Sequence, residues 1–202
     1  MAHTQEPDAN ATSSEQHKLY FGYGSNLSTT QMKTRCPAST PVGLAFLGTG
    51  WEWLINERGY ANVVYRRSEN KDATGTSTST STATGPGVYG VLYRLPPADE
   101  ELLDGYEGVP IAYEKVTLPV LVFAPGEQQG PGEGREAEAL VYVDYHCAGK
   151  GEPLDEYVGR MNRGIREATE AFGLPGCWSL GSWSIKINAV WSNVGLVIAI
   201  TS

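Results

Sequence analysis

The stretch Leu19–Ser28 reads LYFGYGSNLS and connects an expected strand to an expected helix. Its first half, Leu19–Tyr23, is apolar and aromatic, which is typical of a buried strand. Helix signals follow directly, because Ser28 is suited to the N-cap and Gln31 is spaced as its capping-box partner. The sequence therefore predicts a tight, glycine-bearing turn between a strand and a helix.

A turn of this kind offers unpaired backbone N–H groups, and with the helix dipole these favour an anion such as a carboxylate. Gly22 and Gly24 allow a ligand to approach the backbone closely, while Ser25 and Asn26 either donate to it or lock the turn on itself. A well-capped turn without a ligand is the alternative. Ser25 is not expected to be a nucleophile, because a Gly-x-Ser-x-Gly elbow is absent and His146 is the only histidine expected inside the domain.

A second candidate site is Glu107, near the end of an expected helix over Pro96–Gly108. The acidic residues Asp99–Glu101 stabilise the first turn of that helix and need no catalytic role. Glu107 instead lies at the C-terminal end, where the dipole disfavours negative charge, and it precedes the apolar Val109–Ile111. Partial burial there would raise its pKa and suit it to act as a general base. A surface glutamate beside a glycine turn is the alternative. The helix is expected to face the core with Leu102, Leu103 and Tyr106.

The composition of the 202-residue chain is that of an ordinary globular protein with one domain. A formal net charge of -8 disfavours nucleic-acid and anionic-membrane partners, which are usually bound by clustered Lys and Arg. The residues after Met1 are polar and acidic, unlike a secretory signal, and a cytoplasmic location is expected.

Cysteine and histidine spacing gives no metal or disulfide pattern. Three widely spaced cysteines fit neither a disulfide framework nor a zinc cluster: Cys36, Cys147 and Cys177. The histidines also lack metal-ligand spacing: His3, His17 and His146. We therefore expect neither a metal site nor a disulfide framework.

The chain divides into three parts. Residues 1–17 are expected to be a disordered tail, because they are polar and aperiodic. Residues 18–175 form the expected domain, with a low-complexity insert over 67–87 and a glycine-rich loop over Pro125–Gly134. Residues 176–202 are atypical, since tryptophans in Ser-rich sequence precede an apolar run. That segment is an extra strand, a partner-binding tail or translation outside the authentic reading frame.

Strand patterns outnumber helix patterns. One long helix is expected over Pro153–Phe172, with Pro153 in the first turn and Gly173 at the stop. Many strands without a βαβ repeat indicate an α+β fold on a mixed or antiparallel sheet, with closure into a barrel as one option. The expected strands are Leu19–Tyr23, Gly43–Leu47, Trp51–Asn56, Ala61–Tyr65, Val88–Leu95, Tyr113–Phe123 and Ala139–Tyr145.

Two motifs taken together resemble the γ-glutamylcyclotransferase family. They are Tyr20–Leu27 and the later Leu103–Val109, in the order and separation of that family and followed by Tyr113. The resemblance extends from Leu19 to Pro175. It implies a small mixed β-barrel with a few flanking helices.

The resemblance also implies an activity and a site. The reaction is cyclisation of a γ-glutamyl amino acid or peptide to 5-oxoproline with release of the amino acid, a lyase or acyltransferase reaction of glutathione metabolism that uses no cofactor. Glu107 would be the general base. The substrate-binding residues would be Tyr20, Phe21, Gly22, Tyr23, Gly24, Ser25, Asn26, Tyr113 and Tyr157.

Two alternatives remain open at this point. One is a related cyclotransferase that acts on γ-glutamylamines or on a specialised-metabolite glutathione conjugate. The other is a non-catalytic γ-glutamyl-binding module. In each case the expected partner is a small γ-glutamyl molecule rather than nucleic acid or a membrane, and the sequence leaves a homodimer open.

Overall fold

The computed structural model describes residues 17–68, 82–123, 134–175, 186–192 and 195–201. The expected tail over 1–17 lies almost wholly outside these residues, as do most of the Thr/Ser insert and of the glycine-rich loop. Among the described residues, no helix is both long enough and apolar enough to cross a membrane.

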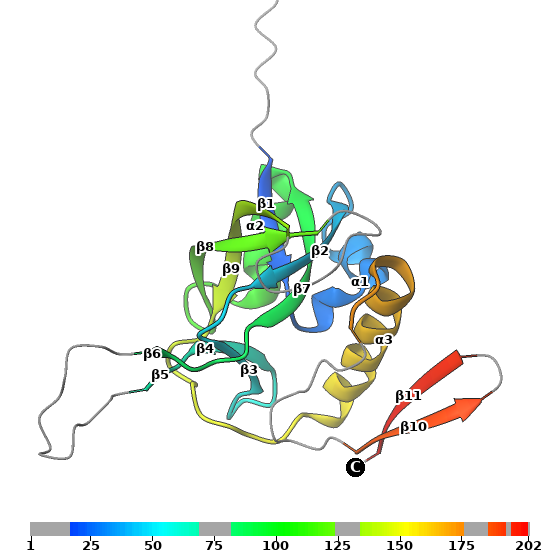
Figure 1. Cartoon of the computed structure of the whole chain (residues 1–202). Coiled ribbons are helices and arrows are strands. Elements are labelled where there is room, and N and C mark those ends of the chain that lie inside the picture. The colour runs from blue at the N-terminus through cyan, green and yellow to red at the C-terminus, as the bar shows by residue number, and fades with distance from the viewer. Residues whose placement is uncertain (1–16, 69–81, 124–133, 176–185, 193–194, 202) are drawn as a thin grey trace, which may run out of the picture.

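Five strands close into a barrel in the order β1-β7-β2-β8-β9. Neighbouring strands are antiparallel except at the seam, where β1 and β9 pair in parallel with Tyr20 opposite Leu140. The α+β class and the small mixed barrel expected from sequence are therefore confirmed (Figure 1). The strands are β1 (Lys18–Gly22), β2 (Thr40–Leu47), β7 (Val88–Leu95), β8 (Glu114–Val122) and β9 (Arg135–Val143).

The barrel strands bury long apolar runs because both of their faces are covered over part of their length. In β7, the four consecutive residues from Gly90 to Tyr93 are all buried. Phe21 of β1 is fully buried and packs against Gly90. Burial of this apolar surface is the main favourable contribution to the fold.

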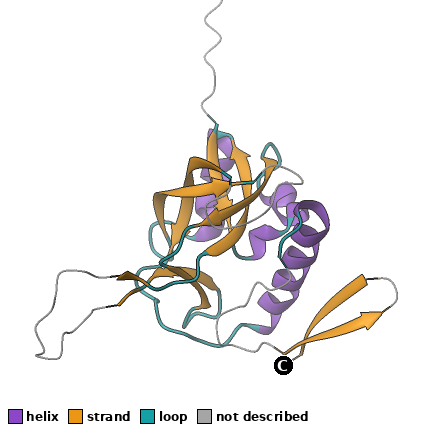
Figure 2. Ribbon diagram, in the orientation of Figure 1, coloured by secondary structure: helices purple, strands orange, loops and turns teal. Residues whose placement is uncertain are grey.

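In the part of the chain that the structure describes, three α-helices and one 3₁₀ turn complete the domain, and α1 and α3 lie together beside the barrel (Figure 2). The elements are η1 (Ser25–Leu27), α1 (Thr29–Arg35), α2 (Pro97–Glu107) and α3 (Asp155–Phe172). Ser28 caps α1 as expected, since its Oγ accepts from the N–H of Gln31 at 3.0 Å. The Gln31 side chain does not complete the capping box and instead donates to Ser25 and Asn26.

Two expectations for the helices are wrong. Leu103 is fully buried, but Leu102 and Tyr106 are 49% and 56% exposed, because only one narrow stripe of α2 packs on the barrel. The long helix begins at Asp155 with Leu154 as its N-cap, so Pro153 lies before the first turn and not in it. Its stop at Gly173 is confirmed, with a left-handed φ of 70°.

Three two-stranded antiparallel sheets of the described residues lie outside the barrel. The first, β3 (Trp51–Ile55) with β4 (Ala61–Tyr65), carries a tight turn at Asn56–Tyr60. The second pairs the ends of the insert, β5 (Arg67–Ser68) with β6 (Thr82–Ala83). The third, β10 (Lys186–Ser192) with β11 (Gly195–Thr201), lies in the atypical C-terminal segment.

Helix α3 approaches η1 closely at Gly164. A Cβ at this position would lie 3.0 Å from Leu27 Cβ and 3.1 Å from the Ser28 nitrogen. The absence of a side chain therefore sets how near α3 comes to the turn after β1. Gly159, on the exposed face of the same helix, has nothing within 4 Å of such a Cβ.

We expect Gly164→Ala and Gly159→Ala to change stability in opposite directions. Overpacking at Gly164 should outweigh the gain in helix propensity and lower the free energy of unfolding by about 1–2 kcal/mol. Gly159→Ala should raise it by about 0.5–1 kcal/mol, because only the propensity term acts there. Urea unfolding of both variants measures this. Equal stabilisation of the two would contradict close packing of α3 on η1.

Candidate active site

A cavity of about 270 Å³ opens where η1, the end of α2, the β3–β4 turn and α3 meet. Eight residues expected from sequence line it, from four separate parts of the chain. They are Tyr20, Tyr23, Gly24, Ser25, Asn26, Glu107, Tyr113 and Tyr157. The structure thus brings the turn and the carboxylate of Glu107 into one cavity.

Phe21 and Gly22 are placed differently. Phe21 points into the barrel and is fully buried against Gly90. Gly22 lies under the turn, where a Cβ would be 3.0 Å from the carbonyl oxygen of Asn26. Both residues shape the turn, and neither is among the described residues that line the cavity.

The Asn26 side chain joins the turn to the end of α2. Its Nδ2 donates to Tyr20 Oη at 2.8 Å and to Glu107 Oε1 at 3.0 Å. Its Oδ1 accepts from Gln31 Nε2 at 2.7 Å and from Arg35 Nη1 at 3.1 Å. The residue is only 4% exposed, so all of its amide atoms are held by protein groups.

Tyr157 of α3 also contacts the turn. Its hydroxyl accepts from the Ser25 N–H at 3.2 Å, and a Cβ at Gly24 would lie 2.8 Å from the same oxygen. Gly24 therefore allows Tyr157 to reach the turn. One N–H group of the expected anion-binding turn is engaged by this hydroxyl.

Glu107 is the last residue of α2. The helix ends in a Schellman motif, in which Val109 N–H bonds to Asp104 C=O at 3.0 Å and Gly108 adopts a left-handed φ of 68°. This ending fixes the direction of the Glu107 side chain, which is 18% exposed and faces the cavity.

Burial raises the pKa of Glu107 above its ordinary value. The charge of Arg35, with Nη1 at 3.7 Å from Oε1, opposes this shift most strongly, and the Asn26 hydrogen bond and the charges of Arg160 and Arg58 add to the opposition. The direction expected from sequence is confirmed. A carboxylate with this environment is more basic than an exposed glutamate.

Three arginines line the cavity and were not expected from sequence: Arg35, Arg58 and Arg160. Arg35 also stacks on the Tyr106 ring at 4.9 Å. Arg160 is held by Glu156 at 2.8 Å, lies 4.9 Å from the Tyr157 ring centroid and donates to Ser25 Oγ at 3.4 Å. Its spacing of three residues from Tyr157 on one helix was the signal that could have identified it.

Tyr157 and Tyr20 are neutral hydrogen-bonding groups of the cavity. Burial raises the pKa of Tyr157 to about 12, although the N–H groups of Ala61 and Ser25 lower it. Burial also raises the pKa of Tyr20, and the Glu107 charge adds to this effect. The cavity therefore combines one basic carboxylate, three guanidinium groups and several hydroxyls, a set suited to a small anionic substrate.

The described residues contain no group of three or more His, Cys, Asp or Glu side chains placed so that they could hold a metal ion. Cys36 is buried and Cys147 is partly buried, and both are free thiols. Cys177 lies outside the described residues.

Comparison with known proteins agrees with this architecture. A family profile described as "Gamma-glutamyl cyclotransferase, AIG2-like" matches residues 20–157, more than half of the chain. The chain belongs to this gamma-glutamyl cyclotransferase family. The matched range includes every residue of the cavity except Arg160.

Solved structures share the fold of this family member at low sequence identity. A structure titled "Gamma-glutamyl cyclotransferase" has 21% identity and a TM-score of 0.55, covering 77% of this chain and 82% of its own. An uncharacterized protein from Homo sapiens has 24% identity and a TM-score of 0.55, with coverage of 80% and 83%. YkqA from Bacillus subtilis has 22% identity and a TM-score of 0.51, with coverage of 76% and 49%. Curated protein sequences give no significant match.

We expect Glu107→Gln to be at least as stable as the wild type at pH 7. Because the folded-state pKa is raised, the stability contributed by Glu107 is present at acid pH and lost as pH rises through that pKa. The advantage of the neutral glutamine should therefore shrink toward about pH 4, where an ordinary glutamate is protonated. Thermal unfolding across this pH range tests the sign.

Glu101→Gln, at an exposed position of the same helix, is the matched control and should show little pH dependence relative to wild type. An advantage of Glu107→Gln that grew toward acid pH would mean that the folded protein stabilises the ionised carboxylate, contrary to the raised pKa.

Proposed function

We propose that this protein converts a γ-glutamyl amino acid or peptide into 5-oxoproline and the free amino acid, with Glu107 as general base. The observation that carries the proposal is the position of the Glu107 carboxylate, partly desolvated in a cavity and bonded to Asn26 of the turn. The family membership supports the reaction class. We place the catalytic unit in residues 18–175.

The glutamyl group is proposed to lie against the turn over Tyr20–Asn26. Its α-carboxylate would pair with Arg160, whose guanidinium reaches Ser25 at 3.4 Å and stacks on Tyr157. An arginine held by a carboxylate and an aromatic ring is positioned before the substrate arrives, which lowers the entropy cost of binding. The α-ammonium group would then lie near Glu107.

The chemistry needs only proton transfers and one acyl transfer. Glu107 takes a proton from the α-ammonium group, and the freed amine attacks the γ-carbonyl carbon in the same molecule. The amide C–N bond then breaks as the leaving nitrogen is protonated. In total, two protons pass from the attacking nitrogen to the leaving nitrogen, which departs as an ammonium group, and Glu107 ends ionised as it began.

The tetrahedral intermediate carries a negative oxygen that requires hydrogen-bond donors. Tyr20 is suited to this role, because it lines the cavity and its hydroxyl accepts from Asn26. Its raised pKa keeps the hydroxyl protonated, so the O–H remains available as a donor. Several buried tyrosines line the cavity, and such electrostatic interactions are stronger there than in bulk water.

Glu107→Gln should lower 5-oxoproline formation from γ-glutamyl-alanine by about 10²–10⁴-fold, because an amide cannot accept the proton. Glu101→Gln is the control and should retain wild-type rates. The assay includes a γ-glutamylamine and glutathione, with product measured by chromatography. Folded wild-type protein that forms no 5-oxoproline from any of the three would instead be a binding module.

The acid limb of the pH profile for kcat/KM should lie above the pKa of an ordinary glutamate, because the base must be ionised and its pKa is raised. Arg35→Met should move this limb to still higher pH, since the Arg35 charge lowers the pKa more than any other group. A limb that stayed in place in Arg35→Met would argue that another group is the base. Arg163→Met, exposed on α3, provides the control.

A further inference from the structure

The turn between β3 and β4 presents Arg58 to the cavity. Asn56 builds this turn: its Oδ1 accepts from the backbone N–H groups of Arg58 and Tyr60, each at 3.1 Å, and its carbonyl accepts from Gly59 at 2.9 Å. Asn56 is fully buried. The backbone at Arg58 is therefore fixed by a side chain beneath it.

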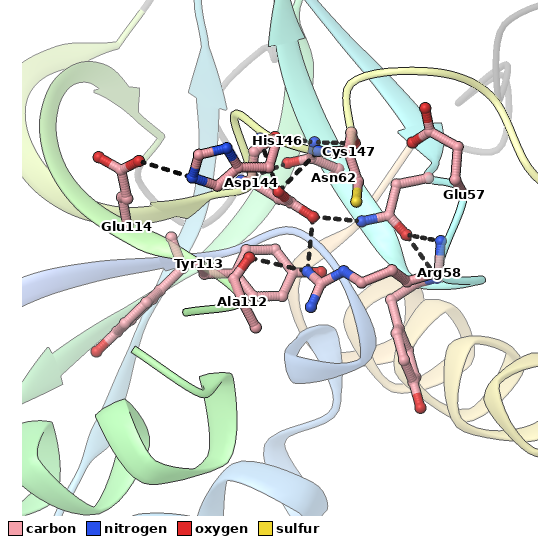
Figure 3. A network of polar contacts seen from close by, with 12 residues as sticks. Glu57, Arg58, Asn62, Ala112, Tyr113, Glu114, Asp144, His146 and Cys147 are labelled. Atoms are coloured by element: carbon pink, nitrogen blue, oxygen red, sulfur yellow. Dashed lines mark hydrogen bonds and ion pairs between the residues drawn. The ribbon is translucent and has the colours of Figure 1, made fainter. Parts of the chain in front are cut away.

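The guanidinium of Arg58 is fixed as well. Its Nη2 donates to Asp144 Oδ2 at 2.7 Å and to the Ala112 carbonyl at 2.9 Å, and its Cζ lies 4.9 Å from the centre of the Tyr113 ring. Figure 3 shows the guanidinium between Asp144, Ala112 and Tyr113. Both hydrogens of Nη2 are used by these two acceptors.

Asp144, which accepts from Arg58, is only 2% exposed. Its Oδ2 also accepts from Asn56 Nδ2 at 3.0 Å, and its Oδ1 accepts from the N–H groups of His146 and Cys147 at 3.0 and 2.9 Å. The same carboxylate thus binds the residue that builds the turn and the arginine that the turn carries. Asp144 therefore accepts from four donors, and Arg58 is the charged group among them.

Arg58 retains donors for a ligand. Its Nε is buried and lacks a hydrogen-bond partner among the residues that the structure describes. A buried N–H without a partner is rare, but this nitrogen has almost no accessible surface, so a ligand would bind through the exposed part of the guanidinium, on a side chain that is 32% exposed. On a guanidinium that lines a cavity, the fitting ligand is an anionic oxygen group, and a carboxylate forms strong charge-assisted hydrogen bonds there.

The position of Arg58 selects which carboxylate this is. In the proposed substrate the α-carboxylate is one carbon from the amine that Glu107 deprotonates, whereas a leaving amino acid carries its carboxylate beyond the amide that breaks. Arg35 lies close to the base, with its Nη1 3.7 Å from Glu107 Oε1. Arg160 contacts the turn, while Arg58 belongs to the separate group around Asp144.

We propose that Arg58, positioned by Asp144 and Asn56, binds the carboxylate of the leaving amino acid and makes the enzyme selective for γ-glutamyl amino acids over γ-glutamylamines. This inference rests on the proposed function, since it assigns the second half of the same substrate. Arg58 is the residue that determines specificity, and Asp144 is a positioning residue that acts through it.

The test compares γ-glutamyl-alanine with γ-glutamyl-alaninamide, which differ only in the leaving-group carboxylate. Wild-type kcat/KM should favour the acid by about 10–100-fold, the value of a charge-assisted hydrogen bond. Arg58→Met should lose this factor, so that the ratio of kcat/KM for the acid to kcat/KM for the amide falls toward one. Arg163→Met is the control and should keep the preference. Equal loss on both substrates would overturn the assignment, because Arg58 would then bind the glutamyl half or hold the fold.

Asp144→Asn should reduce the acid-to-amide ratio in the same direction, chiefly through KM, because the guanidinium loses its fixed orientation. Melting temperature is measured in parallel, and an unchanged ratio in folded Asp144→Asn would refute the positioning role. If a variant at Arg58 does not fold, Arg58→Lys replaces it, with a partial loss of the ratio expected.

Calorimetric binding of the two compounds to Glu107→Gln separates the inference from the proposed function. Stronger binding of the acid than of the amide supports the Arg58 site whether or not turnover occurs. If Glu107→Gln bound both compounds with equal affinity and the wild type turned both over at equal rates, the Arg58 assignment would be refuted and the cyclotransferase proposal would stand. Absence of both binding and turnover would remove the two proposals together.

Discussion

The buried amide of Asn26 is the interaction on which the cavity depends. Its nitrogen bonds to Tyr20 of β1 and to Glu107 of α2, and its oxygen accepts from Gln31 and Arg35 of α1. One side chain therefore sets the distance between the strand, the turn and two helices. Because its donors and acceptors are all used, any displacement of α2 leaves a polar atom unpaired in a buried place, which is costly. The position of the carboxylate is thus tied to the position of the turn.

The sequence predicted those parts of the site that local chemistry determines. The turn follows from glycines between a strand and an N-cap, and the raised pKa of Glu107 follows from a helix end next to apolar residues. Arg35, Arg58 and Arg160 were missed, because an arginine in a helix or a turn is ordinary until the tertiary structure shows what it faces. Leu102 and Tyr106 were assigned to the core because apolar spacing marks a face of a helix, while the width of the covered stripe is set by the barrel. Phe21 was grouped with the ligand-binding turn, whereas alternation along β1 sends it into the core.

The electrostatics of the cavity run against those of the whole chain. The chain has a formal net charge of -8, yet the cavity gathers three guanidinium groups around one carboxylate. Each arginine is held by a different acidic or amide partner: Asn26 for Arg35, Asp144 for Arg58 and Glu156 for Arg160. A small anion entering the cavity meets positive charge whose geometry is already fixed, in surroundings that screen it less than water does.

The parallel seam of the barrel has a consequence for how the domain is made. Tyr20 on β1 pairs with Leu140 on β9, and the cavity needs Tyr157 and Arg160 from the helix that follows. During synthesis, the edge of β1 that pairs with β9 stays uncovered until the ribosome has made most of the chain. Pairing between such distant segments is slow relative to local helix formation, and an open strand edge invites association with other chains during that time. The connectivity that closes the barrel therefore leaves the edges of β1 uncovered until β7 and β9 have been made.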